Sequence, residues 1–353
     1  MKLINFITSV TDEFILKAQW DTSRFPQDQY AIYFNSSEDI AWDLVVVYEN
    51  ISAPIKLKIN KGGGCVYFGA EPPIAHPVGA LFIKQFDKVI LPHRLFVGRG
   101  IKWNAHPSHG YLAWQSVMSS EDGHILDFNE IKGMPKLTKT LNISIVTSTT
   151  KVLPGHFRRT LVIKRLMRDF PGCIDLYGKG YKVIENKHDA LDNYRFHICF
   201  ENTSNRFYWS EKIADPLISY TVPIYLGCKT ISKYFDSDGM ISLKYIEYKK
   251  LKKIIGSIIL SPDEMYNLYA PAMIRNRNAL LTTHNLVNKV IELSNGGGYK
   301  GGSGNSGNKK EIFPMEYNTH SFPFICLRIV HKIGAIYYAI VEKFLLVLNI
   351  IDK

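Results

Sequence analysis

The chain has 353 residues, of which 46% are hydrophobic and 21% are charged, and this composition excludes an intrinsically disordered or a fibrous protein. Its length favours two domains, because a single core stops growing beyond about 250–300 residues. The formal net charge of +11 favours an anionic partner, such as a nucleotide, a nucleic acid or a membrane surface, without choosing among them.

Three short apolar runs in the N-terminal third end in turn-forming residues, and they occupy residues 43–48, 65–73 and 88–92. Their β-branched and aromatic residues predict buried strands separated by loops and helices. The second run reads CVYFGAEPP, so Glu71 is expected to end a strand, and the prolines after it are expected to fix the following loop. The first domain is therefore predicted to present a carboxylate at a strand end.

A second series of strands and helices follows. Strands are predicted at 142–148, 174–178, 195–201 and 222–227, and helices at 156–170 and 210–220. Strands that alternate with helices indicate a parallel sheet of βαβ units. Because this pattern occurs twice, we expect two Rossmann-like domains of the α/β class, one over residues 1–141 and one over residues 142–294.

The C-terminal part changes composition twice. Residues 295–312 are rich in Gly, Ser and Asn and predict a flexible loop. Residues 313–353 form a tail in which charged side chains interrupt every apolar run before the roughly 20 residues that a spanning helix needs. We expect an amphipathic helix there, packed on the protein or lying on an anionic membrane face. The N-terminal MKLINFITSVTDEF has no long apolar core, so we expect no signal peptide and a cytoplasmic protein, peripheral on the inner membrane face if the tail binds lipid.

Polar residues gather in FHICFENTSNRFYWSEK, where a predicted strand ends and a helix begins. This edge of a parallel sheet is where α/β proteins bind ligands. Asn202 can donate to a phosphate oxygen there, and Ser210 is the predicted N-cap of the helix. Lys212 would add a positive charge to a helix N-terminus that already favours anions, and Glu211 can accept hydrogen bonds from sugar hydroxyls. The pattern indicates a nucleotide-sugar site; the alternative is an exposed helix start without a ligand.

The segment YRFHICFENTSNRFYWSEKIADPLISYTVPIYLG, residues 194–227, resembles the signature of the inverting α-1,3/α-1,4-fucosyltransferases that use GDP-fucose, and the likeness extends over about residues 142–245. The resemblance implies that Asn202, Tyr208 and Lys212 contact the diphosphate and that Glu211 binds the ribose. Phe207 and Ser210 are mild departures from the family pattern.

The upstream stretch GHFRR resembles the place where an arginine of the family meets the phosphates. Arg158 is the first choice and Arg159 the second, because the register there is uncertain by one residue. Pro216 departs from the pattern more seriously, since a proline inside a helix removes a backbone hydrogen bond and is expected to kink the helix after Glu211 and Lys212.

The family resemblance also implies a GT-B architecture, with two Rossmann-like domains facing across a cleft. GDP-fucose would bind the second domain and an N-acetylglucosamine-containing oligosaccharide, such as a lipopolysaccharide or lipid-linked glycan, the first. Glu71 would be the general base that takes the acceptor proton. Cationic side chains would stabilise the leaving GDP, so no cofactor is required and a divalent cation is at most stimulatory. The spacing of Asp236 and Asp238 is typical of metal-binding glycosyltransferases, but we expect no metal there.

Two other functions stay open at this stage. One is a transferase for a different GDP-sugar, because contacts to phosphate and ribose do not read the sugar ring. The other is a non-catalytic nucleotide-binding or glycan-binding protein, which Pro216 makes conceivable. We expect no nucleic-acid partner, because the chain has no clustered pattern of Lys, Arg and aromatic residues.

Overall fold

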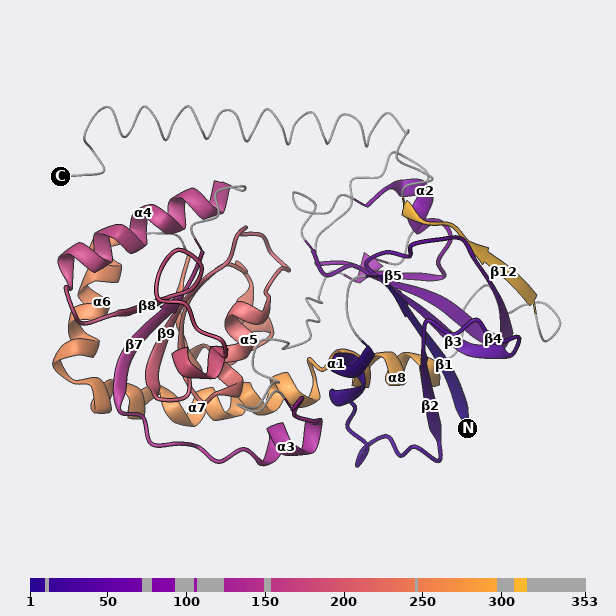
Figure 1. Ribbon diagram of the computed structural model, residues 1–353, viewed down its shortest axis with the longest axis horizontal. Helices are drawn as coiled ribbons and strands as arrows, with labels where there is room; N and C mark the ends of the chain where they lie inside the picture. The colour runs from indigo at the N-terminus through magenta and orange to yellow at the C-terminus, as the bar shows by residue number, and fades with distance from the viewer. Residues whose placement is uncertain are drawn as a thin grey trace. The chain divides into compact units, whose positions relative to one another are not determined.

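The computed structural model describes residues 1–9, 13–71, 78–92, 105–106, 124–148, 154–244, 247–296 and 308–315. The chain divides into two compact units, each described here by itself (Figure 1). The described part of the first unit comes from Met1–Ala113, Ile125–Lys132 and Thr282–Arg328. That of the second comes mainly from Gly133–Leu281.

The first unit is built on a sheet with the strand order β2-β1-β3-β4-β5-β6, to which β12 adds by pairing with β4. Its strands are β1 (Lys2–Thr8), β2 (Tyr30–Phe34), β3 (Ala41–Tyr48), β4 (Ile55–Phe68), β5 (Lys88–Ile90), β6 (Ala105–His106) and β12 (Asn308–Ile312), and its helices are α1 (Glu13–Ala18), α2 (Ala80–Ile83), α3 (Phe128–Gly133) and α8 (Leu286–Gly296). All pairs except β12 with β4 are parallel. The predicted strands at 43–48 and 88–92 are confirmed as β3 and β5, whereas β1 and β2 were not predicted. The run at 65–73 contains the end of β4, which stops at Phe68, so the expectation that Glu71 ends the strand is wrong.

The second unit is built on a five-stranded sheet with the order β11-β10-β9-β7-β8, in which every pair is parallel. Its elements are β7 (Leu141–Val146), α4 (Pro154–Asp169), β8 (Asp175–Tyr177), β9 (Tyr194–Phe200), α5 (Glu211–Ile218), β10 (Val222–Leu226), β11 (Ile241–Leu243), α6 (Tyr248–Leu260) and α7 (Pro262–Thr282). The predicted alternation of strands and helices is confirmed throughout. Both units are thus α/β, as predicted for two Rossmann-like domains; the described sheet of the second is parallel throughout, and that of the first is parallel except for β12.

The strand order places a ligand-binding position in the second unit. In chain order its strands are arranged 2-1-3-4-5, so the order reverses between β7 and β9. In open parallel sheets of this kind, ligands bind outside the carboxyl ends of the strands at the point of reversal. The segments that follow β7 and β9 are therefore the first place to look for a site.

The end of the second domain differs from the predicted 142–294, because α8 belongs to the first unit. The side chains of Leu286, Val290 and Ile291 are fully buried in a core cluster with residues of β1 and β3, and the side-chain amide of Asn285 donates to the Gln19 carbonyl at 2.7 Å. The apolar face of α8 fits either sheet by composition, so the sequence could not assign it.

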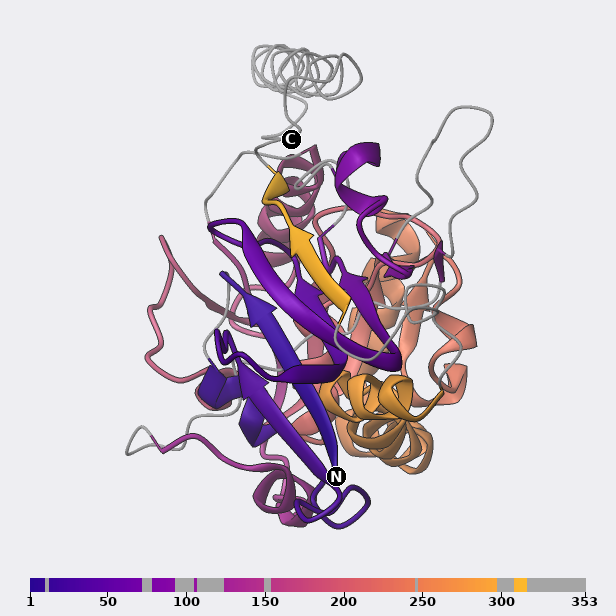
Figure 2. The same ribbon diagram turned by 90° about the vertical axis from the view of Figure 1, so that its right-hand side faces the viewer.

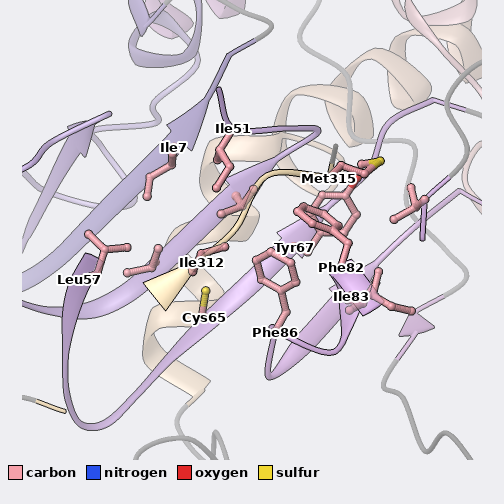
Figure 3. Close-up of a cluster of buried hydrophobic side chains, with 14 of the residues drawn as sticks. Ile7, Ile51, Leu57, Cys65, Tyr67, Phe82, Ile83, Phe86, Ile312 and Met315 are labelled. Atoms are coloured by element: carbon pink, nitrogen blue, oxygen red, sulfur yellow. The ribbon is translucent and has the colours of Figure 1, made fainter. Parts of the chain in front are cut away.

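The predicted loop over 295–312 also ends early, because residues 308–312 form β12 alongside β4 (Figure 2). The NKKEI sequence of β12 has no apolar alternation, and backbone pairing with β4 holds it in the sheet. Ile312 and Met315 then enter a core cluster that includes Tyr67 and Phe82 (Figure 3).

Lys139, which precedes β7, is 6% exposed. Its ammonium donates to the carbonyls of Asp192 and Ser219, each at 2.6 Å, and to the Thr221 hydroxyl at 3.2 Å. These partners lie just before β9 and β10, so this side chain ties together the starts of neighbouring strands. We expect Lys139→Met to lower the free energy of unfolding by about 2–4 kcal/mol, because buried carbonyls lose a charged donor. Denaturant titration measures the loss, and exposed Lys249 on α6 offers the control: Lys249→Met should change stability by less than about 0.5 kcal/mol, and equal losses would contradict the assignment.

Among the helices that the structure describes, none is both long and apolar enough to cross a membrane. The predicted amphipathic tail, residues 313–353, lies outside the described residues from residue 316 onward. Its helix and its contact with a membrane face therefore stay predictions.

Candidate functional site

Three cationic side chains from different elements line one small cavity of about 30 Å³ beside β9. Arg159 comes from α4, which follows β7, and Lys212 comes from α5, which follows β9. Lys187 comes from a short 3-10 helix (Lys187–Ala190) that precedes β9. The cavity thus lies where the strand order reverses, and its lining favours an anionic ligand.

The start of α5 has the predicted geometry. Ser210 is the N-cap in an extended conformation, and its hydroxyl accepts a hydrogen bond from the Lys212 amide at 3.3 Å. Glu211 and Lys212 therefore occupy the first turn, as predicted. Pro216 lies inside the helix, which continues beyond it to Ile218. The cap is set upstream of the proline, so the Glu-Lys pair keeps its place at the helix start.

The Lys212 ammonium lies between two carboxylates, 2.7 Å from Glu211 and 3.9 Å from Glu201. Burial alone would lower the pKa of Lys212, but these two carboxylates outweigh it and raise the pKa. Burial likewise opposes ionisation of Glu211, yet the ammonium groups of Lys212 and Lys187 and the hydrogen bonds to its carboxylate together outweigh it and lower the Glu211 pKa. The side chains of Lys212 and Glu211 are 21% and 34% exposed, so an ionised cation and an ionised anion are both accessible to a ligand.

Arg159 is 9% exposed, and its guanidinium donates to the Asn202 side-chain oxygen at 2.7 Å. This bond leaves the amide hydrogens of Asn202 available for another acceptor. The Nε of Arg159 is buried without a hydrogen-bond partner among the described residues. A buried unpaired donor is costly, so a ligand oxygen at this position would stabilise the site. The side chain of Arg158, the first choice from the sequence, lies outside the described residues.

Lys187 was missed by the sequence reasoning. Its ammonium pairs with the carboxylate of Asp215 in α5, and the side chain of Lys187 is only 15% exposed. No local spacing connects the two residues, because the fold alone brings them together. His197 on β9 also lines the cavity, but burial lowers its pKa to about 3 and its Nδ1 lies 2.8 Å from the Ser144 hydroxyl. His197 is therefore a neutral structural side chain.

Tyr208 is 4% exposed, and its backbone amide donates to the Asn205 side chain at 2.7 Å. This bond holds the loop between β9 and α5. The contact of Tyr208 with a diphosphate stays a prediction.

Glu71 belongs to the first unit and is exposed. It lies beyond the end of β4 at Phe68, in the turn after the strand. Its backbone amide donates to the carboxylate of Glu49 at 2.8 Å, and Ala70 donates to the same oxygen. Glu49 is 4% exposed and adopts a left-handed φ of 62°. The buried Glu49 thus holds the backbone at the exposed residue Glu71.

The first of the two aspartates with metal-binding spacing has its carboxylate engaged elsewhere. The Asp236 carboxylate accepts from the Arg275 guanidinium at 2.6 Å and from the Asp238 amide at 3.0 Å. Within the described parts of the chain, no group of three or more His, Cys, Asp or Glu side chains is placed to hold a metal ion.

Residues 137–271 match the model of the glycosyltransferase family 10 (fucosyltransferase) C-terminal domain. This segment contains the cavity and all of its cationic residues, so the site lies in a glycosyltransferase domain. It is a family 10 domain, and the family resemblance found in the sequence is confirmed.

Comparison with known proteins gives a second match, which covers fewer residues. The alpha-(1,3)-fucosyltransferase FucT of Helicobacter pylori is 41% identical over 79 residues, which are 22% of this chain and 16% of that protein. The matched stretch is therefore a small part of the relative's length.

Among solved structures, an alpha1,3-fucosyltransferase with GDP-fucose is similar, with a TM-score of 0.47 and 16% identity, covering 84% of this chain and 92% of that one. Sucrose-phosphate synthase of Thermosynechococcus elongatus has a TM-score of 0.46 and 7% identity, covering 84% of this chain and 98% of that one.

Proposed function

We propose that the protein is an inverting α-1,3/1,4-fucosyltransferase, which moves L-fucose from GDP-fucose to a hydroxyl of an N-acetylglucosamine-containing glycan. The observation that carries this proposal is that Arg159 and Lys212 line one cavity of a family 10 domain, with Asn202 hydrogen-bonded to Arg159. The Helicobacter pylori relative, an alpha-(1,3)-fucosyltransferase, supports fucose as the transferred sugar.

In this proposal the second unit binds the donor. Arg159 and Lys212 bind the diphosphate, together with the N-terminal amides of α5 and the side-chain amide of Asn202. Glu211 accepts hydrogen bonds from the ribose hydroxyls. As the bond from the anomeric carbon to the phosphate oxygen breaks, negative charge develops on the leaving GDP, and fixed cations stabilise that charge. These side chains take the place of a metal, so the proposed reaction requires no cofactor.

The first unit would supply the base. The Glu71 carboxylate takes the proton of the acceptor hydroxyl while the acceptor oxygen forms its bond to the anomeric carbon, and GDP leaves with the electron pair of the broken bond. Attack from the face opposite GDP inverts the configuration. The exposed position of Glu71, on a turn held by Glu49, supports this role. The proposal includes contact of the C-terminal tail with an anionic membrane face. Only the sequence pattern of the tail supports this contact.

Acceptor-dependent release of GDP tests the proposal. With GDP-fucose we expect turnover on N-acetyllactosamine or lacto-N-biose, with a fucosylated product of the opposite anomeric configuration to the donor. Faster turnover with another GDP-sugar would assign a different donor. Binding of GDP without turnover on any acceptor would indicate a binding protein.

A further inference from the structure

A second carboxylate lies behind the donor site. Glu201 follows β9, and its side chain is fully buried. The carboxylate accepts hydrogen bonds from the Ser210 amide at 2.8 Å and from the Ser210 hydroxyl at 2.7 Å, and it lies 3.9 Å from the Lys212 ammonium. Burying a carboxylate costs several kcal/mol unless it is paired and hydrogen-bonded. The three contacts named here come from the start of α5.

The surroundings of Glu201 hold its side chain in one conformation. A Cβ atom at Gly227, just after β10, would lie 2.3 Å from the Cγ of Glu201, so only glycine leaves room for the glutamate. The Tyr225 hydroxyl lies 3.5 Å from the carboxylate and accepts from the Cys228 amide at 2.9 Å. Gly227 and Tyr225 thus confine the Glu201 side chain next to β10, and its carboxylate contacts the start of α5.

We propose that Glu201 is a positioning residue, which holds Ser210 and Lys212 so that the Lys212 ammonium meets the diphosphate of the donor. Ser210 is the bridge, because its hydroxyl donates to Glu201 and accepts from the Lys212 amide. Lysine has a flexible stem; without Glu201 its ammonium would keep only the contact with Glu211 and would lose the second carboxylate that holds it in place. The inference rests on the proposed function, in which Lys212 binds the diphosphate.

The burial of Glu201 also makes the stability of the protein depend on pH. Burial raises the pKa of Glu201 to about 7, although Lys212 opposes the rise. The titratable, charged and hydroxyl groups that act on it are Ser210, Glu211 and Lys212 of the α5 start, Arg159 of α4, Tyr225 of β10, Cys228 after β10 and Cys199 of β9.

Between about pH 5 and 7 the folded state therefore binds a proton that the unfolded chain has lost, and the free energy of unfolding falls as pH rises. Glu201→Gln removes this dependence. Its stability relative to wild type should rise from pH 5 to pH 8, and a difference that is equal at both pH values would mean that folding does not raise the pKa of Glu201.

The decisive experiment is a double-mutant cycle on GDP affinity, measured by calorimetry with the full chain. We expect Glu201→Gln to weaken GDP binding roughly 10- to 100-fold. In a Lys212→Met background the same change should have no weakening effect, because the residue through which Glu201 acts is gone. Glu185→Gln, at an exposed glutamate of the same unit, should leave GDP affinity unchanged.

Equal weakening by Glu201→Gln in both backgrounds would overturn the inference while leaving the proposed function intact. Absence of GDP binding by the wild type would instead reject the proposed function, and the inference with it. If Glu201→Gln does not fold, Ser210 provides the second test. Ser210→Ala should weaken GDP binding, and Ser210→Thr, which keeps the bridging hydroxyl, should restore it; wild-type affinity of Ser210→Ala would overturn the inference.

Discussion

Glu71→Gln is expected to lower the turnover number by roughly 10²- to 10⁴-fold, the range that a general base contributes, while GDP affinity stays within about twofold. The amide has nearly the shape of the carboxylate but cannot take the acceptor proton. Glu71 is exposed and lies on a turn that is held through its backbone amide, which donates to Glu49 at 2.8 Å, so the substitution leaves this hydrogen bond in place. Initial rates of GDP release and calorimetric GDP binding measure the two quantities separately.

Glu38→Gln is the matched control, because Glu38 is an exposed glutamate of the same unit. It should retain wild-type turnover. A Glu71→Gln protein that keeps more than about a tenth of the wild-type rate would assign the base to another residue. Parallel losses of turnover and GDP affinity would mean that Glu71 supports folding or donor binding.

Arg159→Met is expected to weaken GDP binding about 10- to 100-fold, because a charge-assisted contact to the diphosphate is lost. The Nε of Arg159 is buried and has no hydrogen-bond partner among the described residues, so it can donate a hydrogen bond to a ligand oxygen. Arg159→Lys should restore only part of the affinity, since an ammonium keeps the charge but lacks the planar fork. Calorimetry on the variants measures the loss.

Two residues of the same helix complete this test. Lys164→Met, at an exposed position of α4, should bind GDP as the wild type does. Arg158→Met decides the register that the sequence left open. If Arg158→Met loses affinity and Arg159→Met does not, the phosphate contact belongs to Arg158 and the assignment of Arg159 is wrong.

The fold was predictable where local pattern determines it. The strand runs at 43–48 and 222–227, with their β-branched residues and turn-forming ends, appear as β3 and β10. The placement of α8 was not predictable, because its apolar residues could pack equally well on either sheet. The strand β12 could not be predicted for a different reason. Its polar NKKEI sequence joins the sheet through backbone hydrogen bonds, and amino-acid composition does not predict such pairing.

The candidate site divides in the same way. The Ser210 cap and the first-turn positions of Glu211 and Lys212 follow from the spacing of neighbouring residues, so the sequence predicted them. Lys187 pairs with Asp215 only after the fold joins distant segments. Glu201 belongs to the FHICFENTSNRFYWSEK segment. Its burial and its contacts with α5 could not be predicted, because they depend on how the carboxyl end of β9 meets the start of the helix.

The most direct measurement of the central claim is the initial rate of GDP release by the wild-type protein from GDP-fucose and from GDP-mannose, each with and without N-acetyllactosamine or lacto-N-biose. We predict release that depends on the acceptor, is fastest with GDP-fucose and yields a fucosylated glycan with inverted configuration. Acceptor-independent release, or an equal or faster rate with GDP-mannose, would contradict the assignment of the protein as a fucosyltransferase.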